Sequence, residues 1–174
     1  MIPLGFLSKK PTVFKNVALL TEGATANVDQ PVLYGTISNV LKGNRSYVNA
    51  DLSNAVGFID NTNVADIVIQ FLEKKNIQAV LTFANQDSIG NGPEPTPTSV
   101  GTYGYFTLIE LFIYDDTTSS WLSMGTKDNS VNKFVLLQYD GFSYDTTKIK
   151  VRVWGAESNI LTLYNIEAYG FNRA

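Results

Sequence analysis

The sequence predicts an all-β fold, an antiparallel β-sandwich of the jelly-roll type. Short runs rich in β-branched and aromatic residues recur along the 174-residue chain, and Gly, Pro, Asn, Asp or Ser bounds them. Apolar residues with the helical period are hard to find. Many short strands with almost no helix favour a sandwich over a parallel α/β sheet.

The expected strands follow one another at short spacing. They span 16–20, 32–38, 66–72, 76–85, 103–115, 120–126, 133–138, 147–155 and 160–169. The two brief first strands contain Val, Leu and Ile, and the next two read DIVIQFL and NIQAVLTFAN. Aromatic and β-branched residues dominate the later strands, and the last two alternate apolar and polar residues. One short helix is expected at 53–59, where Gly57 interrupts it.

Several connections have recognisable turn sequences. LEKKN at 72–76 is a charged turn between two apolar runs and predicts a hairpin or a close pairing of the two runs. DDTTSS at 115–120 supplies side-chain hydrogen bonds for a second turn, and Asp140 with Gly141 is a strong turn pair. The longest break, 85–101, carries alternating prolines and is a plain surface excursion or a loop at a binding surface.

The composition is that of one folded domain. With 44% hydrophobic and 17% charged residues, the chain has enough apolar material for a core. The net charge of −3 argues against nucleic-acid binding, and no apolar run is long enough to span a membrane. The absence of Cys and His excludes disulfides, Cys/His zinc sites and the usual nucleophile–base catalytic pairs.

Residues 1–15 are expected to form an extended arm in front of a single β-sandwich domain, 16–174. The arm holds three lysines and no acid, and its prolines favour an extended path. It is a solvated tail, or it docks on an acidic partner surface. In the second interpretation the docking residues are Ile2, Leu4, Phe6, Leu7, Lys9 and Lys10. The lysines follow the apolar run, unlike those of a classical export signal.

The ordered set of motifs resembles the galactose-binding-domain-like family, which includes discoidin and coagulation-factor type C domains and many carbohydrate-binding modules. The resemblance is carried by NVALLTEGATA at 16–26, LSNAVGFIDNTNVADIVIQFLEKKNIQAVLTF at 52–83, FTLIELFIYDDTTSSWLSM at 106–124 and KIKVRVWGAESNILTLYNIEAYG at 148–170. It covers roughly residues 16–170 and implies the same jelly roll. The closing segment is expected to be the last hairpin, returning the C-terminus to the start of the domain.

The resemblance implies a structural calcium ion and no other cofactor. Family members hold this ion with an Asp-led loop and an acid near the C-terminus, and the matching residues are Asp60, Asn61, Thr62, Asn63 and Glu167. Calcium prefers oxygen ligands, which this loop supplies. The sequence departs from the family at Asn165, where many members have Glu. The alternative is an ordinary Asx-rich turn with Glu167 facing solvent.

Sugar binding needs an aromatic surface beside hydrogen-bonding groups, because a sugar ring presents both apolar faces and hydroxyls. Tyr103, Tyr105 and Tyr144 lie near loops, which cluster at the ends of a sandwich, and we expect them to contact a sugar. Trp121 and Trp154 lie inside strand patterns, and we expect them in the core.

We expect no catalytic residues. The conspicuous carboxylate pairs are Asp115 with Asp116 and Asp140 with Asp145. Glycoside hydrolysis uses paired carboxylates, but both of these pairs lie in turns, where Asp is common for local reasons. An enzyme is therefore disfavoured.

Two functions stay open. The favoured one is a non-enzymatic structural or adhesion protein of a bacteriophage virion, a capsid decoration, head-fibre or tail component whose arm docks on other virion proteins. We expect a homo-oligomer with a host-surface glycan as a further partner. The alternative is a carbohydrate-binding module of a secreted or cell-surface system, which would be extracellular.

Overall fold

The computed structural model describes residues 14–43, 56–58, 64–84, 106–132, 134, 136–155 and 161–173, and every structural statement below concerns these residues. Their strands are β1 (Lys15–Asn16), β2 (Thr25–Val28), β3 (Val32–Gly35), β4 (Val56–Phe58), β5 (Val64–Ala84), β6 (Phe106–Asp115), β7 (Ser120–Asp128), β8 (Leu136–Tyr139), β9 (Tyr144–Gly155) and β10 (Leu161–Asn172). Two short 3-10 helices, η1 (Leu20–Glu22) and η2 (Ile37–Leu41), are the only helical segments in this part of the chain.

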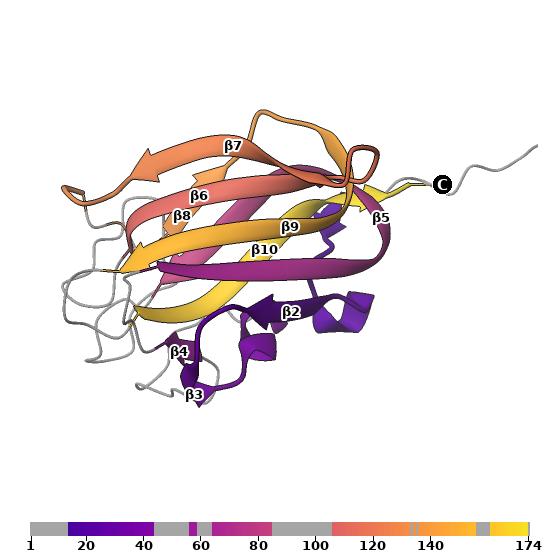
Figure 1. Ribbon diagram of the computed structural model, residues 1–174. Helices are drawn as coiled ribbons and strands as arrows, with labels where there is room; N and C mark the ends of the chain where they lie inside the picture. The colour runs from indigo at the N-terminus through magenta and orange to yellow at the C-terminus, as the bar shows by residue number, and fades with distance from the viewer. Residues whose placement is uncertain are drawn as a thin grey trace, which may run out of the picture.

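Strand β5 organises the sandwich because it belongs to both layers. Its first part, Val64 to Gln70, pairs with β2 and β9, and its second part pairs with β8 and β10. The pairing with β9 shifts register between Gln70 and Lys75. Figure 1 shows β5 curving round at that point, which folds one continuous hydrogen-bonded network into two layers.

The first sheet has the strand order β2–β5–β9–β6–β7, and the second has the order β3–β4–β10–β5–β8. Every pairing is antiparallel. The predicted all-β antiparallel sandwich is therefore confirmed. β1 pairs with β10, so the described C-terminus lies beside the start of the domain, also as predicted.

The core lies between the two sheets because inward positions alternate with outward positions along each strand. In β9, for example, Ile149, Val151 and Val153 are buried, whereas the residues between them are partly exposed. The core continues onto β6 with Ile109, Leu111 and Ile113, and onto β5 and β10 with the following residues: Ile67, Ile69, Ile77, Val80, Leu163, Ile166 and Ala168.

Gly170 marks a close approach between β10 and β5. A Cβ atom at Gly170 would lie 1.9 Å from the backbone oxygen of Asn76, so no side chain fits there. The register between the strands shifts at this position, from Tyr169 paired with Ala79 to Gly170 paired with Ile77. The glycine in the closing motif is thus required by packing.

Three local predictions are wrong. Residues 72–76 do not close a hairpin: the two apolar runs are one bent strand, because each finds its partners in a different sheet. The helix predicted at 53–59 is contradicted at Val56–Phe58, which is the strand β4 between β3 and β10. β9 and β10 form no closing hairpin, since β5 lies between them and pairs with both.

The predicted turns at 115–120 and 140–141 are confirmed. Asp115 accepts hydrogen bonds from the backbone N–H groups of Thr117 and Thr118, and this turn joins β6 to β7. Gly141 has a φ of 76°, which suits a turn between β8 and β9. No helix in the described part of the chain is long and apolar enough to cross a membrane.

Candidate functional site

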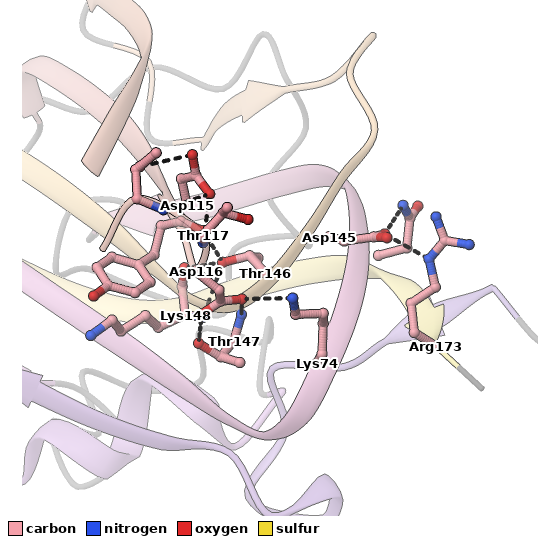
Figure 2. Close-up of polar contacts among 12 residues, drawn as sticks. Lys74, Asp115, Asp116, Thr117, Asp145, Thr146, Thr147, Lys148 and Arg173 are labelled. Carbon is pink, nitrogen blue, oxygen red and sulfur yellow. Dashed lines mark hydrogen bonds and ion pairs between the residues drawn. The ribbon is translucent and has the colours of Figure 1, made fainter. Parts of the chain in front are cut away.

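The candidate site lies at the end of the sandwich where β5 bends, which we call the bend end. There β9 begins, with Tyr144 paired to Ile77, and β10 finishes, with Asn172 paired to Lys75. The turn between β6 and β7 is at the same end, because Lys74 forms an ion pair of 3.4 Å with Asp116. Figure 2 shows these side chains around the bend of β5.

A pocket of about 200 Å³ opens at the bend end. It is lined by Ile113, Tyr114, Asp115, Leu122, Tyr144 and Asp145. Tyr144 and Leu122 are 40% and 43% exposed, so both an aromatic ring and an aliphatic side chain are open to a ligand. Phe142 supports Tyr144 with a ring–ring contact of 6.5 Å between centroids. The pocket therefore combines apolar surface with two carboxylates.

Asp145 is the carboxylate with an available oxygen. Its Oδ1 accepts hydrogen bonds from Arg173 Nε (2.7 Å) and Asn76 Nδ2 (2.6 Å) (Figure 2). The bonds from Arg173 and Asn76 lower the pKa of Asp145, so the group is ionised at neutral pH. Within the described part of the chain, Oδ2 has no hydrogen-bond partner, and it can accept a bond from a ligand hydroxyl.

The other predicted carboxylates serve the local structure. Asp115 braces its turn, and the hydrogen bond from the Thr118 hydroxyl, with those from the backbone, lowers its pKa. Asp116 accepts bonds from the backbone N–H and hydroxyl of Thr147, as Figure 2 shows, and Asp140 accepts one from Gln138. A general acid at a glycosidase site needs a raised pKa. The lowered pKa values of Asp115 and Asp145 therefore favour structural or binding roles.

Only one of the predicted calcium ligands, Glu167, lies within the described residues, since 60–63 fall outside them. Glu167 is 2% exposed and therefore does not face solvent as the alternative interpretation required. Its carboxylate accepts hydrogen bonds from Asn165 Nδ2 (2.8 Å) and the Tyr169 hydroxyl (2.9 Å). The Oδ1 atom of Asn165 is buried with no partner among the described residues. A carboxylate beside an unpaired amide oxygen fits the donors that calcium prefers.

The other predicted site residues are distributed as follows. Tyr103, Tyr105 and the docking residues Ile2, Leu4, Phe6, Leu7, Lys9 and Lys10 lie outside the described residues. Phe106, which follows Tyr105 in the sequence, pairs with Gly155 at the opposite end of β9 from Tyr144. We therefore treat the Tyr144 pocket as a site of its own.

The prediction that Trp121 and Trp154 lie in the core is wrong. Both are partly exposed, on the outer face of the first sheet. Trp121 pairs with Tyr114 across β6 and β7, and Trp154 alternates with the buried Val153. The run KIKVRVW carries the signal that sequence reasoning missed, because its cations and its Trp occupy alternate positions and therefore share one face.

No protein-family model and no curated protein sequence matches the chain. Solved structures do match. A family 32 carbohydrate-binding module of Clostridium perfringens NanJ, in complex with galactose, is 10% identical with a TM-score of 0.63, covering 90% of this chain and 99% of the module. A chitosan-binding module from a chitosanase/glucanase of Paenibacillus is 12% identical with a TM-score of 0.63, covering 90% and 99%.

A fucose-binding module of Streptococcus pneumoniae is 14% identical with a TM-score of 0.60, and the match covers 91% of this chain and 99% of that module. At these identities the likeness concerns the fold. It extends over nearly the whole of each module. The chain has the galactose-binding-like β-sandwich fold of the family 32 carbohydrate-binding modules.

Proposed function

We propose that this chain is a non-catalytic carbohydrate-binding module. The observation that carries the proposal is the pocket at the bend end, where the exposed ring of Tyr144 lies beside the ionised carboxylate of Asp145. A sugar offers an apolar face to a tyrosine ring and hydroxyl donors to a carboxylate oxygen. The similar modules that bind galactose, chitosan and fucose support the same ligand class.

This proposal reverses the order of the two functions expected from the sequence. The comparisons give no support to a capsid decoration, head-fibre or tail protein, and they support the alternative, a module that binds glycans. With this function we propose the extracellular location that was expected from the sequence for the alternative. Docking through residues 1–15 and a homo-oligomeric state remain predictions.

The ligand class can be tested with a glycan array and isothermal titration calorimetry. We expect the purified chain to bind one or more glycans, and Tyr144→Ala to weaken that binding. Tyr144→Phe keeps the ring and should keep most of the affinity. Asp145→Asn should also weaken binding, since it replaces a charged acceptor with a neutral amide. Circular dichroism of each variant controls for the fold.

The outcomes separate the function from the site. An array without any hit contradicts the proposed function. Glycan binding that survives Tyr144→Ala but is lost in Tyr103→Ala or Tyr105→Ala leaves the function in place and moves the site to those residues.

A further inference from the structure

We propose that the outer face of the first sheet binds an acidic glycan, one that carries carboxylates, along a basic row made of Lys148, Lys150 and Arg152. The inference rests on the proposed function, which gives glycans as the class of ligand. It adds a second binding surface and the requirement that the glycan is negatively charged. The row lies on β9, between β5 and β6. At Lys148 it adjoins the pocket, because Lys148 lies over the ring of Tyr114, which also lines the pocket.

The row is a consequence of strand alternation. Lys148, Lys150 and Arg152 occupy every second position, while the intervening Ile149 and Val151 are buried in the core. Alternate residues of a strand are about 6.8 Å apart, so the row extends for about 14 Å. A straight line of like charges suits an extended polymer with a repeated charge better than a compact monosaccharide.

Aromatic rings hold the three cations in place. Lys148 Nζ lies 3.7 Å from the ring centre of Tyr114 and 5.7 Å from that of Trp121. Lys150 Nζ lies 4.2 Å from the ring centre of Phe112. These contacts fix the cations on the sheet without neutralising them, because a ring attracts a cation but carries no net charge.

Arg152 ends the row in the same way. Its Cζ atom lies 5.3 Å from the ring centre of Phe112 and 6.0 Å from that of Trp154. The row therefore has partly exposed aromatic side chains along its β6 and β7 side, and Trp154 follows it on β9.

The acids near the row lie toward its Arg152 end. Asp66 is bonded to both Nε and Nη2 of Arg152 at 2.6 and 2.8 Å, and the same carboxylate lies 3.3 Å from Lys150 Nζ. Glu110, opposite Arg152 on β6, accepts a hydrogen bond from Ser123. Among the described residues, Lys148 has no carboxylate partner. The charges of Glu110 and Asp29 also raise the pKa of Arg152, after the hydrogen bond and charge of Asp66. The acids therefore act on Lys150 and Arg152, and the positive charge of Lys148 is left available to an anionic ligand.

The chemistry favours a glycan over a nucleic acid. Single-stranded nucleic acids bind by stacking bases on open aromatic faces. Here cations already lie over the rings of Tyr114 and Phe112, so those faces are not open to a base. Carboxylates and hydroxyls, by contrast, meet the ammonium and guanidinium donors directly.

Titration with polygalacturonate, a polymer of uronic acids, tests the inference. We expect binding that Lys148→Gln with Lys150→Gln weakens about tenfold or more, equivalent to about 1.4 kcal/mol. Lys127→Gln is the matched control, because Lys127 also lies over a ring, 5.0 Å from the centre of Tyr139, but pairs with the inward Ile109. It removes one positive charge, against two in the double variant, and should leave the affinity nearly unchanged. Circular dichroism confirms the fold of each variant.

The same titration uses three comparison ligands: a neutral galactan, polyglutamate and a single-stranded oligonucleotide. Equal affinity for polyglutamate or the oligonucleotide overturns the inference, because charge alone would then explain binding. Binding to neutral glycans but not to polygalacturonate overturns the inference and leaves the proposed function intact. Binding to no glycan at all overturns both.

Discussion

The outer faces of the two sheets differ in the polarity and the exposure of their side chains. On the first sheet, outward positions carry the basic row and partly exposed rings. On the second sheet, the outward residues Phe83, Leu136 and Tyr164 are at most 6% exposed and pack with Tyr34 and Leu81 as a second apolar cluster. The first face is therefore available to a ligand, whereas the second is part of the stable structure.

One strand supplies both faces. Outward positions in the first part of β5 include Asp66 and Gln70, while the second part places Leu81 and Phe83 outward. The change from polar to apolar outward residues follows the bend between Gln70 and Lys75. The polarity of the outward residues can therefore differ between the two parts of a single strand.

The largest expected effect comes from the apolar outer cluster. Phe83→Ala should lower the free energy of unfolding by about 3–5 kcal/mol, because it leaves a cavity around a ring that is 2% exposed. Phe112→Ala, on the partly exposed face of the first sheet, should lower the free energy of unfolding clearly less than Phe83→Ala does. Chemical denaturation of both variants measures the difference, and equal losses would contradict the distinction between the two faces.

The second effect concerns the buried polar pair on β10. If calcium binds beside Glu167, an excess of about 100 times its dissociation constant should stabilise the chain by about 2.7 kcal/mol. EDTA should remove the shift in thermal denaturation, and Glu167→Gln should abolish it. Glu110→Gln is the control, since Glu110 bonds to Ser123 on the other sheet. If calcium does not shift thermal denaturation, or shifts it equally in Glu167→Gln, calcium does not bind beside Glu167.

A third effect tests the link between the sheets. Tyr139 of β8 places its hydroxyl 2.8 Å from the backbone oxygen of Ile109 and 3.0 Å from that of Gly125, across the sandwich. Tyr139→Phe should therefore cost about 1–2 kcal/mol at neutral pH.

The same hydroxyl gives this link a pH dependence. Burial raises the pKa of Tyr139 from the ordinary tyrosine value of 10.0 to about 12. The unfolded chain releases this proton first, so stability falls as pH rises from 10 to 12, by about 1.4 kcal/mol for each pH unit. Tyr139→Phe should lack that part of the slope in alkaline denaturation. An unchanged slope would mean that Tyr139 does not hold its proton in the fold.

Much of the fold follows from the sequence because strand signals are local. Runs such as 147–155 and the turn at 115–120 are explained by alternation and by Asp, Thr and Ser hydrogen bonds. The bend at 72–76 was read as a hairpin because a charged break looks the same whether the chain reverses onto itself or crosses to another layer. Only the distant partners β9 and β10 decide between these outcomes.

The candidate site was less predictable than the fold. The sequence predicts Tyr144 as a sugar contact from its place near a loop. Its pocket, however, also needs Leu122, which is distant in the sequence, beside the neighbouring Asp145. Trp121 and Trp154 were assigned to the core because large apolar residues in strands usually face inward. Their true side depends on the register of β6, β7 and β9, which pairs Tyr114 with Trp121 and Leu108 with Trp154.

The smallest effect on stability, and the most direct test of the first face, comes from Asp66→Asn. Burial by itself raises the pKa of Asp66, but the hydrogen bonds from Arg152 and the charge of Lys150 lower it overall. Because the folded pKa is depressed, the stabilisation is present above the ordinary pKa of Asp and is lost as pH falls through the folded value. The free energy of unfolding of the variant should be about 1 kcal/mol lower than that of the wild type at neutral pH. It should also fall less steeply than that of the wild type as the pH is lowered.

Asp66→Asn also leaves Lys150 and Arg152 without their shared carboxylate. It should therefore bind polygalacturonate more tightly than the wild type does, in calorimetry at low salt, while becoming less stable. A matched substitution, Asp116→Asn, removes a carboxylate bonded to Lys74 and Thr147 at the bend end, outside the basic row. Equal effects of the two substitutions on polygalacturonate binding would show that the outer face of the first sheet has no special role.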